Sequence, residues 1–171
     1  PILSAMGVQC CPLPTAVLSQ HTGFDQFFFS DLTPHLPQYI DSWNRQGITF
    51  DTVYSGFLGS QQQIHLVDRF IDTQKNALIF VDPVMGDGGK VYVTYTPLMC
   101  DGMRTLVGKA GIVTPNITEA CLLTDTTYPG ESPDRDVVKM LAQRVGEIGP
   151  RYTVITGIQE GRQIASLAYD K

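Results

Sequence analysis

The chain has 171 residues and a formal net charge of −5, and 43% of its residues are apolar. This composition is that of one ordinary globular domain and argues against a disordered chain. The sequence contains no basic run and no apolar stretch of the roughly 18 residues that a membrane span needs, which excludes nucleic acid and the membrane as expected partners.

The first half of the chain predicts short strands and two amphipathic helices. The strands are expected at 8–11, 15–19, 50–55 and 78–81. The first helix spans 33–46 between Asp31 and Gly47, and the second begins after Ser60, with Gln63 placed for a capping box. The apolar stripes of the two helices are Leu36, Tyr39, Ile40 and Trp43, and Ile64, Val67, Phe70 and Ile71.

The second half continues the alternation of strands and helices. Strands are expected at 91–95, 111–114, 152–156 and 163–168, and helices at 96–107, 116–123 and 132–148. Strands that alternate with helices favour a mostly parallel sheet flanked by helices. The expected fold class is therefore α/β, in three layers.

Both ends of the sequence are abrupt. The chain opens at Pro1 in a helical tail that Gly7 closes, and it stops at Lys171 directly after a strand-like run. No signal-peptide pattern precedes the fold. We expect residues 1–171 to form a single domain that is an interior piece of a longer protein and lacks elements at both ends.

The four cysteines lack the spacing of a zinc site or of a redox pair. Cys10 and Cys11 are adjacent, whereas Cys100 and Cys121 stand far along the chain. We expect all four to lie reduced in the core of a cytosolic protein.

A segment rich in glycine and carboxylates follows the strand expected at 78–81. It covers residues 82–90 and reads D-P-V-M-G-D-G-G-K. Asp82 and Asp87 suit a Mg²⁺ ion that also holds substrate phosphates, and the glycines let backbone amides approach an anion. A solvated Asp-Gly turn between two elements explains the same residues equally well.

Polar residues stand at the ends of four expected strands. These residues are Ser55, Asp82, Thr114 and Thr156. The carboxyl ends of parallel strands share one edge of a sheet, where open α/β folds bind ligands. Core packing does not require this repetition, so this edge is the predicted functional site.

The segment T-P-N-I-T-E-A at 114–120 has two interpretations. As structure, Asn116 is a helix N-cap and Glu119 stands at the third helical position, so that the pair satisfies two backbone amides. As function, Glu119 faces the same edge as Asp82 and can organise Mg²⁺ through water. The two roles are compatible, because Asn116 can cap the helix and also contact a phosphate.

Two further segments carry weaker signals. His21 stands beside Thr22 in a loop, and a lone histidine in a loop is more often structural than catalytic. The three phenylalanines at 27–29 are a candidate apolar contact, either under a loop or at a subunit interface.

In chain order, these motifs resemble those of the pyridoxal kinases of the ribokinase-like superfamily. The resemblance covers nearly the whole chain. The segment at 114–120 is shared across the superfamily, whereas D-P-V-M-G-D followed by Tyr92, together with the His-Thr-Gly segment, is typical of vitamin B6 kinases. The matching residues are L-S-Q-H-T-G at 18–23, G-F-L at 56–58, D-P-V-M-G-D at 82–87, Tyr92, T-P-N-I-T-E-A at 114–120 and V-I-T-G at 154–157.

The resemblance implies ATP-dependent phosphorylation of the 5′-hydroxymethyl group of pyridoxal, pyridoxine or pyridoxamine by a cytoplasmic homodimer. It implies that ATP and its phosphates are bound by Asp82, Asp87, Asn116, Glu119 and Thr156. It implies that Mg²⁺ and a monovalent cation, K⁺ or Na⁺, are held by Asp82, Asp87, Thr114, Glu119 and Thr156. It implies that the vitamin is contacted by Leu18, His21, Thr22 and Phe57, and by Tyr92 from a flap over the site.

The sequence departs from the family in one important respect. The family's G-x-G-D segment carries the aspartate that activates the substrate hydroxyl, and it forms an anion hole at a helix N-terminus. No G-x-G-D occurs in these 171 residues, and the family's N-terminal strand with its substrate-binding serine is absent as well. We therefore assign no catalytic residue within this chain and expect the 171 residues alone to be inactive.

Other functions remain open. A hydroxymethylpyrimidine (phosphate) kinase of thiamin synthesis belongs to a sister family, although the D-P-V-M-G-D loop and Tyr92 favour the B6 kinases. A non-catalytic protein that binds pyridoxal or a nucleotide is a third possibility. A flavodoxin-like or receiver domain fits the alternation of elements but does not need polar residues at successive strand ends.

Overall fold

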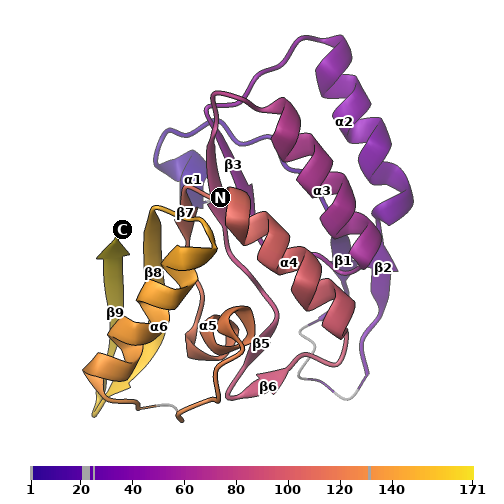
Figure 1. The fold of residues 1–171 in the computed structure, drawn as a ribbon. Helices are drawn as coiled ribbons and strands as arrows, with labels where there is room; N and C mark the ends of the chain where they lie inside the picture. The colour runs from indigo at the N-terminus through magenta and orange to yellow at the C-terminus, as the bar shows by residue number, and fades with distance from the viewer. Residues whose placement is uncertain (1, 21–23, 25, 131) are drawn as a thin grey trace.

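A computed structural model describes residues 2–20, 24, 26–130 and 132–171. Its centre is a five-stranded sheet with the strand order β3-β4-β7-β8-β9 (Figure 1). The first four strands are parallel, and β9 runs antiparallel to β8. The predicted α/β class with a mostly parallel sheet is confirmed. The strands are β3 (Thr52–Ser55), β4 (Leu78–Val81), β7 (Ile112–Val113), β8 (Tyr152–Glu160) and β9 (Gln163–Asp170).

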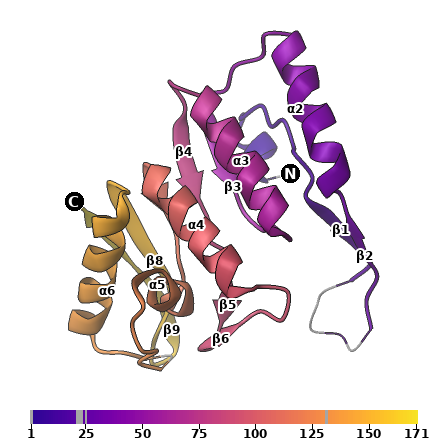
Figure 2. The same ribbon diagram turned by 45° about the vertical axis from the view of Figure 1, so that its right-hand side comes forward.

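Three long helices cover one face of this sheet, as Figures 1 and 2 show. They are α3 (Gln61–Thr73), α4 (Pro97–Lys109) and α6 (Arg135–Ile148). A fourth helix, α2 (Leu36–Arg45), packs against α3, and the short α5 (Ile117–Thr124) packs against α6 and against β5. None of the described helices combines the length and the apolar character that crossing a membrane requires.

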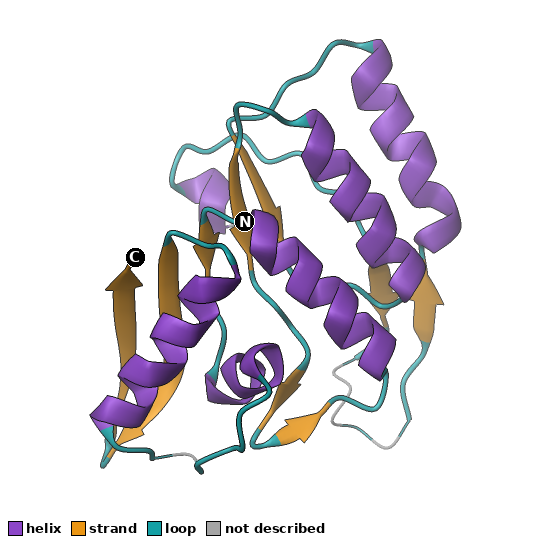
Figure 3. Ribbon diagram, viewed as in Figure 1, coloured by secondary structure: helices purple, strands orange, loops and turns teal. Residues whose placement is uncertain are grey.

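The remaining elements are short, and Figure 3 separates them by type. Four short strands form two β-hairpins beside the main sheet. One hairpin consists of β1 and β2, and the other of β5 and β6. Their bounds are β1 (Ala16–Leu18), β2 (Phe29–Asp31), β5 (Gly86–Asp87) and β6 (Lys90–Val91), with α1 (Ile2–Ala5) and a 3₁₀ turn (Thr33–His35) completing the list.

Helices α3 and α4 begin where the sequence predicts, each after a side-chain N-cap. Ser60 accepts a hydrogen bond from the amide of Gln63 at 3.2 Å, and Thr96 accepts one from Met99 at 3.3 Å. Pro97 occupies the first turn of α4, where its missing N–H costs nothing. The predicted stripe of α3 is buried, with no side chain above 6% exposure: Ile64, Val67, Phe70 and Ile71.

The two faces of the sheet differ in exposure. One row of side chains across the parallel strands lies buried beneath the helices: Ser55, Val81, Val113 and Thr153. The row one position earlier points to the opposite face, because side chains alternate along a strand. Tyr54 is 55% exposed and Tyr152 38% exposed in this second row, so part of the opposite face is apolar and open.

The prediction of a strand at 8–11 is wrong. These residues form no strand, and both Cys10 and Cys11 are exposed instead of lying in the core. A strand must pair its backbone amides and carbonyls with a neighbour, and this segment has no ladder partner among the described residues. Cys100 is half-buried and Cys121 buried, and all four thiols are free.

Three other element boundaries also differ from the prediction. The strand expected at 91–95 stops at Val91, because the chain turns there and the amide of Tyr95 bonds to the carbonyl of Tyr92 at 2.8 Å. The first helix begins at Leu36 after the 3₁₀ turn, and the helix expected from Ser132 begins at Arg135.

The strand predicted at 152–156 continues beyond Thr156, to Glu160. A β-bulge at this point places two residues of β8, Thr156 and Gly157, opposite one residue of β9. Gly157 adopts a φ of 70°, which a glycine tolerates and other residues rarely do. The bulge lets β8 continue its pairing with β9 to Glu160.

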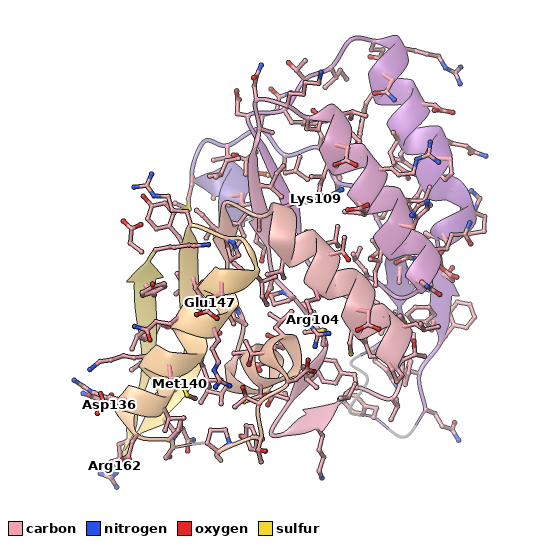
Figure 4. The ribbon with its side chains drawn as sticks, in the orientation of Figure 1. Arg104, Lys109, Asp136, Met140, Glu147 and Arg162 are labelled. Carbon is pink, nitrogen blue, oxygen red and sulfur yellow. The ribbon has the colours of Figure 1, made fainter. Side chains whose placement is uncertain are left out.

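An ion cluster joins the two central helices. The ammonium of Lys109 on α4 lies 2.7 Å from a carboxylate oxygen of Asp68 and of Asp72, both on α3 (Figure 4). Lys109→Met removes both pairs, and we expect it to lower the free energy of unfolding by about 1 kcal/mol at low salt and by less at high salt, because the cluster is partly exposed.

Chemical denaturation at two salt concentrations measures this loss. Lys139→Met is the matched control, because Lys139 contacts the exposed Asp136 on its own helix and joins no second element. A loss no larger than that of the control would contradict a bridging role for Lys109.

Candidate active site

The polar residues at the strand ends meet at one edge of the sheet, as predicted. The amide of Asp82 donates to the carbonyl of Ser55 at 2.8 Å, and the amide of Thr114 donates to that of Val81 at 3.1 Å. Beyond the ladder, the amide of Thr156 donates to the carbonyl of Pro115 at 2.9 Å. Hydrogen bonds between adjacent strands therefore hold Ser55, Asp82, Thr114 and Thr156 in one line.

Asp82 lies half-buried at the centre of this edge. The hydroxyl of Tyr54 donates to its carboxylate at 3.2 Å. Burial raises the pKa of the Asp82 carboxyl, while hydrogen bonds from Tyr54 and Thr114 oppose that rise. Tyr54 was not predicted as a site residue, because only the pairing of β3 with β4 brings it beside Asp82.

The first turn of α5 shows the capping contacts of the T-P-N-I-T-E-A segment. Asn116 accepts a hydrogen bond from the amide of Glu119 at 2.9 Å, and Glu119 accepts one from the amide of Asn116 at 2.8 Å. The predicted capping box is therefore confirmed. The second carboxylate oxygen of Glu119 accepts from the amide of Met85 at 3.2 Å, which ties the cap to the glycine segment.

Glu119 is 4% exposed and has no basic partner in these contacts. Burial is the main cause that raises the pKa of its carboxyl to about 7, and the charges of Asp82 and Asp87 add to the rise. The hydrogen bonds from Asn116 and Met85 favour the charged form but do not outweigh burial.

The glycine segment folds as a tight hairpin and not as an open turn. Gly88 and Gly89 have φ values of 56° and 76°, the two positive angles of the two-residue turn that suits a hairpin. A side chain at Gly86 would meet the carbonyl oxygen of Lys90 at 2.3 Å, so the hairpin closes only around glycine. The exposed residue Asp87 lies directly before this turn.

Three hydrogen bonds hold this hairpin against α5. Besides the contact of Met85 with Glu119, the side chain of Asn116 donates to the carbonyl of Gly86 at 2.8 Å. The amide of Gly89 donates to the hydroxyl of Thr118 at 2.9 Å. Thr118 is 4% exposed, and its anchoring role was not predicted. In the sequence, Thr118 is a hydroxyl residue between the cap residues Asn116 and Glu119. That position alone does not predict which group the hydroxyl binds.

A shallow pocket opens between the hairpin, the start of α5 and the bulge of β8. Tyr128 forms part of its wall, and the ring packs so closely on Gly89 that a side chain there would approach it to 2.6 Å. The pocket brings together two of the predicted phosphate-side residues, Asp87 and Asn116. Its lining is Asp87, Gly88, Asn116, Ile117, Thr118, Tyr128, Gly157, Gln159 and Ile164.

Negative charge gathers around Tyr92. Burial first, and then the carboxylates of Asp87, Glu119 and Asp82, raise the pKa of its phenol. In the part of the chain that the structure describes, no three acidic, histidine or cysteine side chains lie close enough to enclose a metal ion. Asp82 and Asp87 are carboxylate donors of the kind that Mg²⁺ takes one or two of, together with water and phosphate.

The predicted vitamin side of the site is described in part. Leu18 ends β1 and lies directly opposite Phe29 of β2. The rings of Phe29 and Phe57 meet edge to face, with centroids 6.4 Å apart. Phe29 is therefore an aromatic neighbour of the predicted site, whereas the sequence indicated it only as part of a candidate apolar contact at 27–29. His21 and Thr22 lie outside the described residues.

A parallel sheet whose carboxyl edge carries Asp82, Asn116 and Glu119 beneath a glycine hairpin is the arrangement of the ribokinase-like class. Comparison with known proteins agrees with this class. A family model described as phosphomethylpyrimidine kinase matches residues 2–171, so the chain belongs to that family.

Three relatives illustrate the range of similarity. A structure from Bacteroides thetaiotaomicron, assigned as a phosphomethylpyrimidine kinase and crystallised with pyridoxal, is 39% identical, with a TM-score of 0.92 over 99% of this chain and 61% of that one. Pyridoxal kinase from Lactobacillus plantarum is 30% identical, with a TM-score of 0.88 and the same coverage. Pyridoxal kinase from Arabidopsis thaliana is 29% identical over 93% of this chain and 52% of its own. The chain spans about half the length of the curated relatives it matches.

The anchoring role of Thr118 can be tested at constant side-chain volume. Thr118→Val leaves the amide of Gly89 without its acceptor, and we expect a loss of about 1–2 kcal/mol in the free energy of unfolding. Hydrogen exchange at Gly89 should accelerate, while Thr118→Ser, which keeps the hydroxyl, should behave like the parent chain. Thr105→Val at an exposed site of α4 is the control, and unchanged exchange in the Thr118 variant would contradict the anchor.

The raised pKa of Glu119 predicts how stability varies with pH. The folded chain holds the proton more tightly than the unfolded chain, so the free energy of unfolding should fall as pH rises from about 4.5 to about 7 and then level. A shift of this size corresponds to at most about 3 kcal/mol. Glu119→Gln should flatten this part of the curve, as measured by denaturation at several pH values. Parallel curves for the two proteins would show that Glu119 is already ionised at pH 5.

Proposed function

We propose that the protein to which this chain belongs transfers the γ-phosphate of ATP to the 5′-hydroxymethyl group of pyridoxal, pyridoxine or pyridoxamine. The observation that carries this proposal is the strand-end cluster of Asp82, Asn116 and Glu119, joined by hydrogen bonds to the glycine hairpin. The similarity to a structure crystallised with pyridoxal, at 39% identity, supports the vitamin as substrate.

The proposed site has a phosphate side and a vitamin side. On the phosphate side, Asp87 and Asn116 line the pocket beside the bulge and, together with Thr156, would contact ATP phosphates. Phosphoryl transfer depends mainly on positioning and on neutralising charge, and a hairpin tied to a helix N-terminus suits that task. On the vitamin side, Leu18 and Phe57 would contact the pyridine ring. His21 and Thr22 would contact the vitamin as well, and Tyr92 would cover it from the proposed flap.

Cations complete the proposed phosphate side. Asp82 and Asp87 would hold Mg²⁺, which neutralises phosphate charge when bound. Glu119 would act through water, because both of its oxygens already accept backbone hydrogen bonds. Thr114 and Thr156, with Asp82, would face a monovalent cation, K⁺ or Na⁺. A cation in this cluster would also favour the ionised form of Glu119.

The proposed reaction needs residues that this chain does not contain. The G-x-G-D aspartate that activates the acceptor hydroxyl in the resembled family is absent from the sequence. Tyr54 and Tyr152 are also exposed, so part of one face of the sheet lies open. We therefore propose that residues 1–171 form part of one kinase domain and do not turn over substrate alone. A homodimer in the cytoplasm is proposed on the resemblance.

A pyrimidine kinase of thiamin synthesis is the second candidate function. The description of the matching family, phosphomethylpyrimidine kinase, favours it. The Asp82–Asp87 segment followed by Tyr92 favours the B6 vitamers. A non-catalytic protein that binds pyridoxal is the third candidate, and it requires that no catalytic aspartate exists elsewhere in the protein.

The decisive experiment incubates the full-length protein with Mg²⁺–ATP and either pyridoxal or hydroxymethylpyrimidine, and detects the phosphorylated product by mass. We expect pyridoxal 5′-phosphate, and a fall of roughly 100-fold or more in kcat for Asp82→Asn, because charge stabilisation at the transferring group is lost. Asp136→Asn on α6 is the matched control. Product from the pyrimidine alone would establish the second candidate, and pyridoxal binding without product the third.

A further inference from the structure

Gln63 is a fully buried polar residue that the proposed chemistry does not use. It lies in the first turn of α3 with 0% of its side chain exposed, whereas its neighbours Gln61 and Gln62 face solvent. A buried amide group is stable only when its donors and its acceptor are all paired. The partners of Gln63 therefore show what the residue holds together.

The amide of Gln63 bonds to separate segments of the chain. Its oxygen accepts from the amide of Gly59 at 2.7 Å, which replaces the predicted reach back to Ser60. Its nitrogen donates to the carbonyl of Thr15 and to the hydroxyl of Thr33, both at 2.8 Å, and lies 3.0 Å from the carboxylate of Asp31. One side chain thus joins both ends of the β1–β2 hairpin to the loop that precedes α3.

The β1–β2 hairpin and the loop before α3 also carry the apolar side chains on the proposed vitamin side, which are Leu18, Phe29 and Phe57. The hydroxyl of Thr15 donates to the carbonyl of Phe57 at 2.9 Å. Gly59 lies between the rings, since a side chain there would stand 3.2 Å from Phe29 and 3.3 Å from Phe57. Leu18 is the cross-strand partner of Phe29, so Leu18, Phe29 and Phe57 come together only when the hairpin and the loop are held in register.

We propose that Gln63 is a positioning residue for the vitamin ring, and that Phe29 is a further member of the wall that Leu18 and Phe57 form against it. This inference rests on the proposed function of the same site. The hydrogen bonds of Gln63 reach none of the phosphate-side residues, such as Asn116 and Glu119. Loss of the Gln63 amide should therefore weaken the use of pyridoxal and leave the use of ATP unchanged.

The main test compares Gln63→Met with Gln62→Met in the full-length protein. Methionine keeps the length and approximate volume of glutamine but forms none of its hydrogen bonds. We expect the KM for pyridoxal to rise roughly tenfold in Gln63→Met, because small displacements of positioning groups have large effects, while the KM for ATP stays within about twofold. Gln62→Met should match the parent protein. An equal rise in both KM values, or no rise, would overturn the proposal.

A milder pair of variants keeps the test valid if Gln63→Met folds poorly. Thr15→Val removes only the hydrogen bond to Phe57 at constant shape, and Thr15→Ser retains it. We expect the KM for pyridoxal to rise a few-fold in the valine variant and to return to the parent value in the serine variant, since the hydroxyl is the group that matters. Equal KM values for Val and Ser would overturn the coupling of Thr15 to Phe57.

Hydrogen exchange separates failure of this proposal from failure of the proposed function. Exchange at 15–18 and at 57–60 should accelerate together in Gln63→Met and in neither segment in Gln62→Met. If the parent protein phosphorylates no B6 vitamer, the proposed function fails, and joint acceleration still supports the coupling of the two segments. Unchanged exchange, or acceleration of one segment alone, overturns the coupling whatever the substrate.

Discussion

The hydrogen bonds of the buried Glu119 carboxylate hold together the proposed phosphate side of the site. One of its oxygens closes the capping box of α5, and the other holds the amide of Met85 at the base of the glycine hairpin. A carboxylate taken out of water is stable only if hydrogen bonds replace its hydration. The Glu119 side chain therefore links the cap of α5 to the glycine hairpin and fixes the hairpin beside the strand ends.

Gln63 has a corresponding place on the vitamin side. Both residues stand at the third position of a helix and use a side chain to bind backbone groups of a neighbouring loop. Loops lack the ladder of hydrogen bonds that sets the position of a strand, so buried side chains must supply their partners. The contacts of Gln63 and those of Glu119 share no residue, so different segments of the chain hold the two sides of the proposed site.

The described residues form only part of what the proposed reaction requires. The row of Tyr54, Phe80, Ile112 and Tyr152 is apolar and lies on the face that α3, α4 and α6 do not cover. Apolar surface of this kind is normally buried by further structure. The chain spans about half the length of the curated relatives it matches, and no G-x-G-D occurs in these 171 residues.

The sequence by itself determined the alternation of strands and helices, the caps at Ser60, Thr96 and Asn116, and the line of polar residues at the strand ends, because these follow from local periodicity and local hydrogen bonding. The absence of a strand at 8–11 depended on pairing with a distant neighbour, which no local pattern encodes. Only the tertiary structure decided which groups of distant segments bond to Glu119, Thr118 and Gln63. Those partners lie 29 to 48 residues away along the chain, apart from Gly59 and the residues of the caps, and packing alone brings them within hydrogen-bond distance.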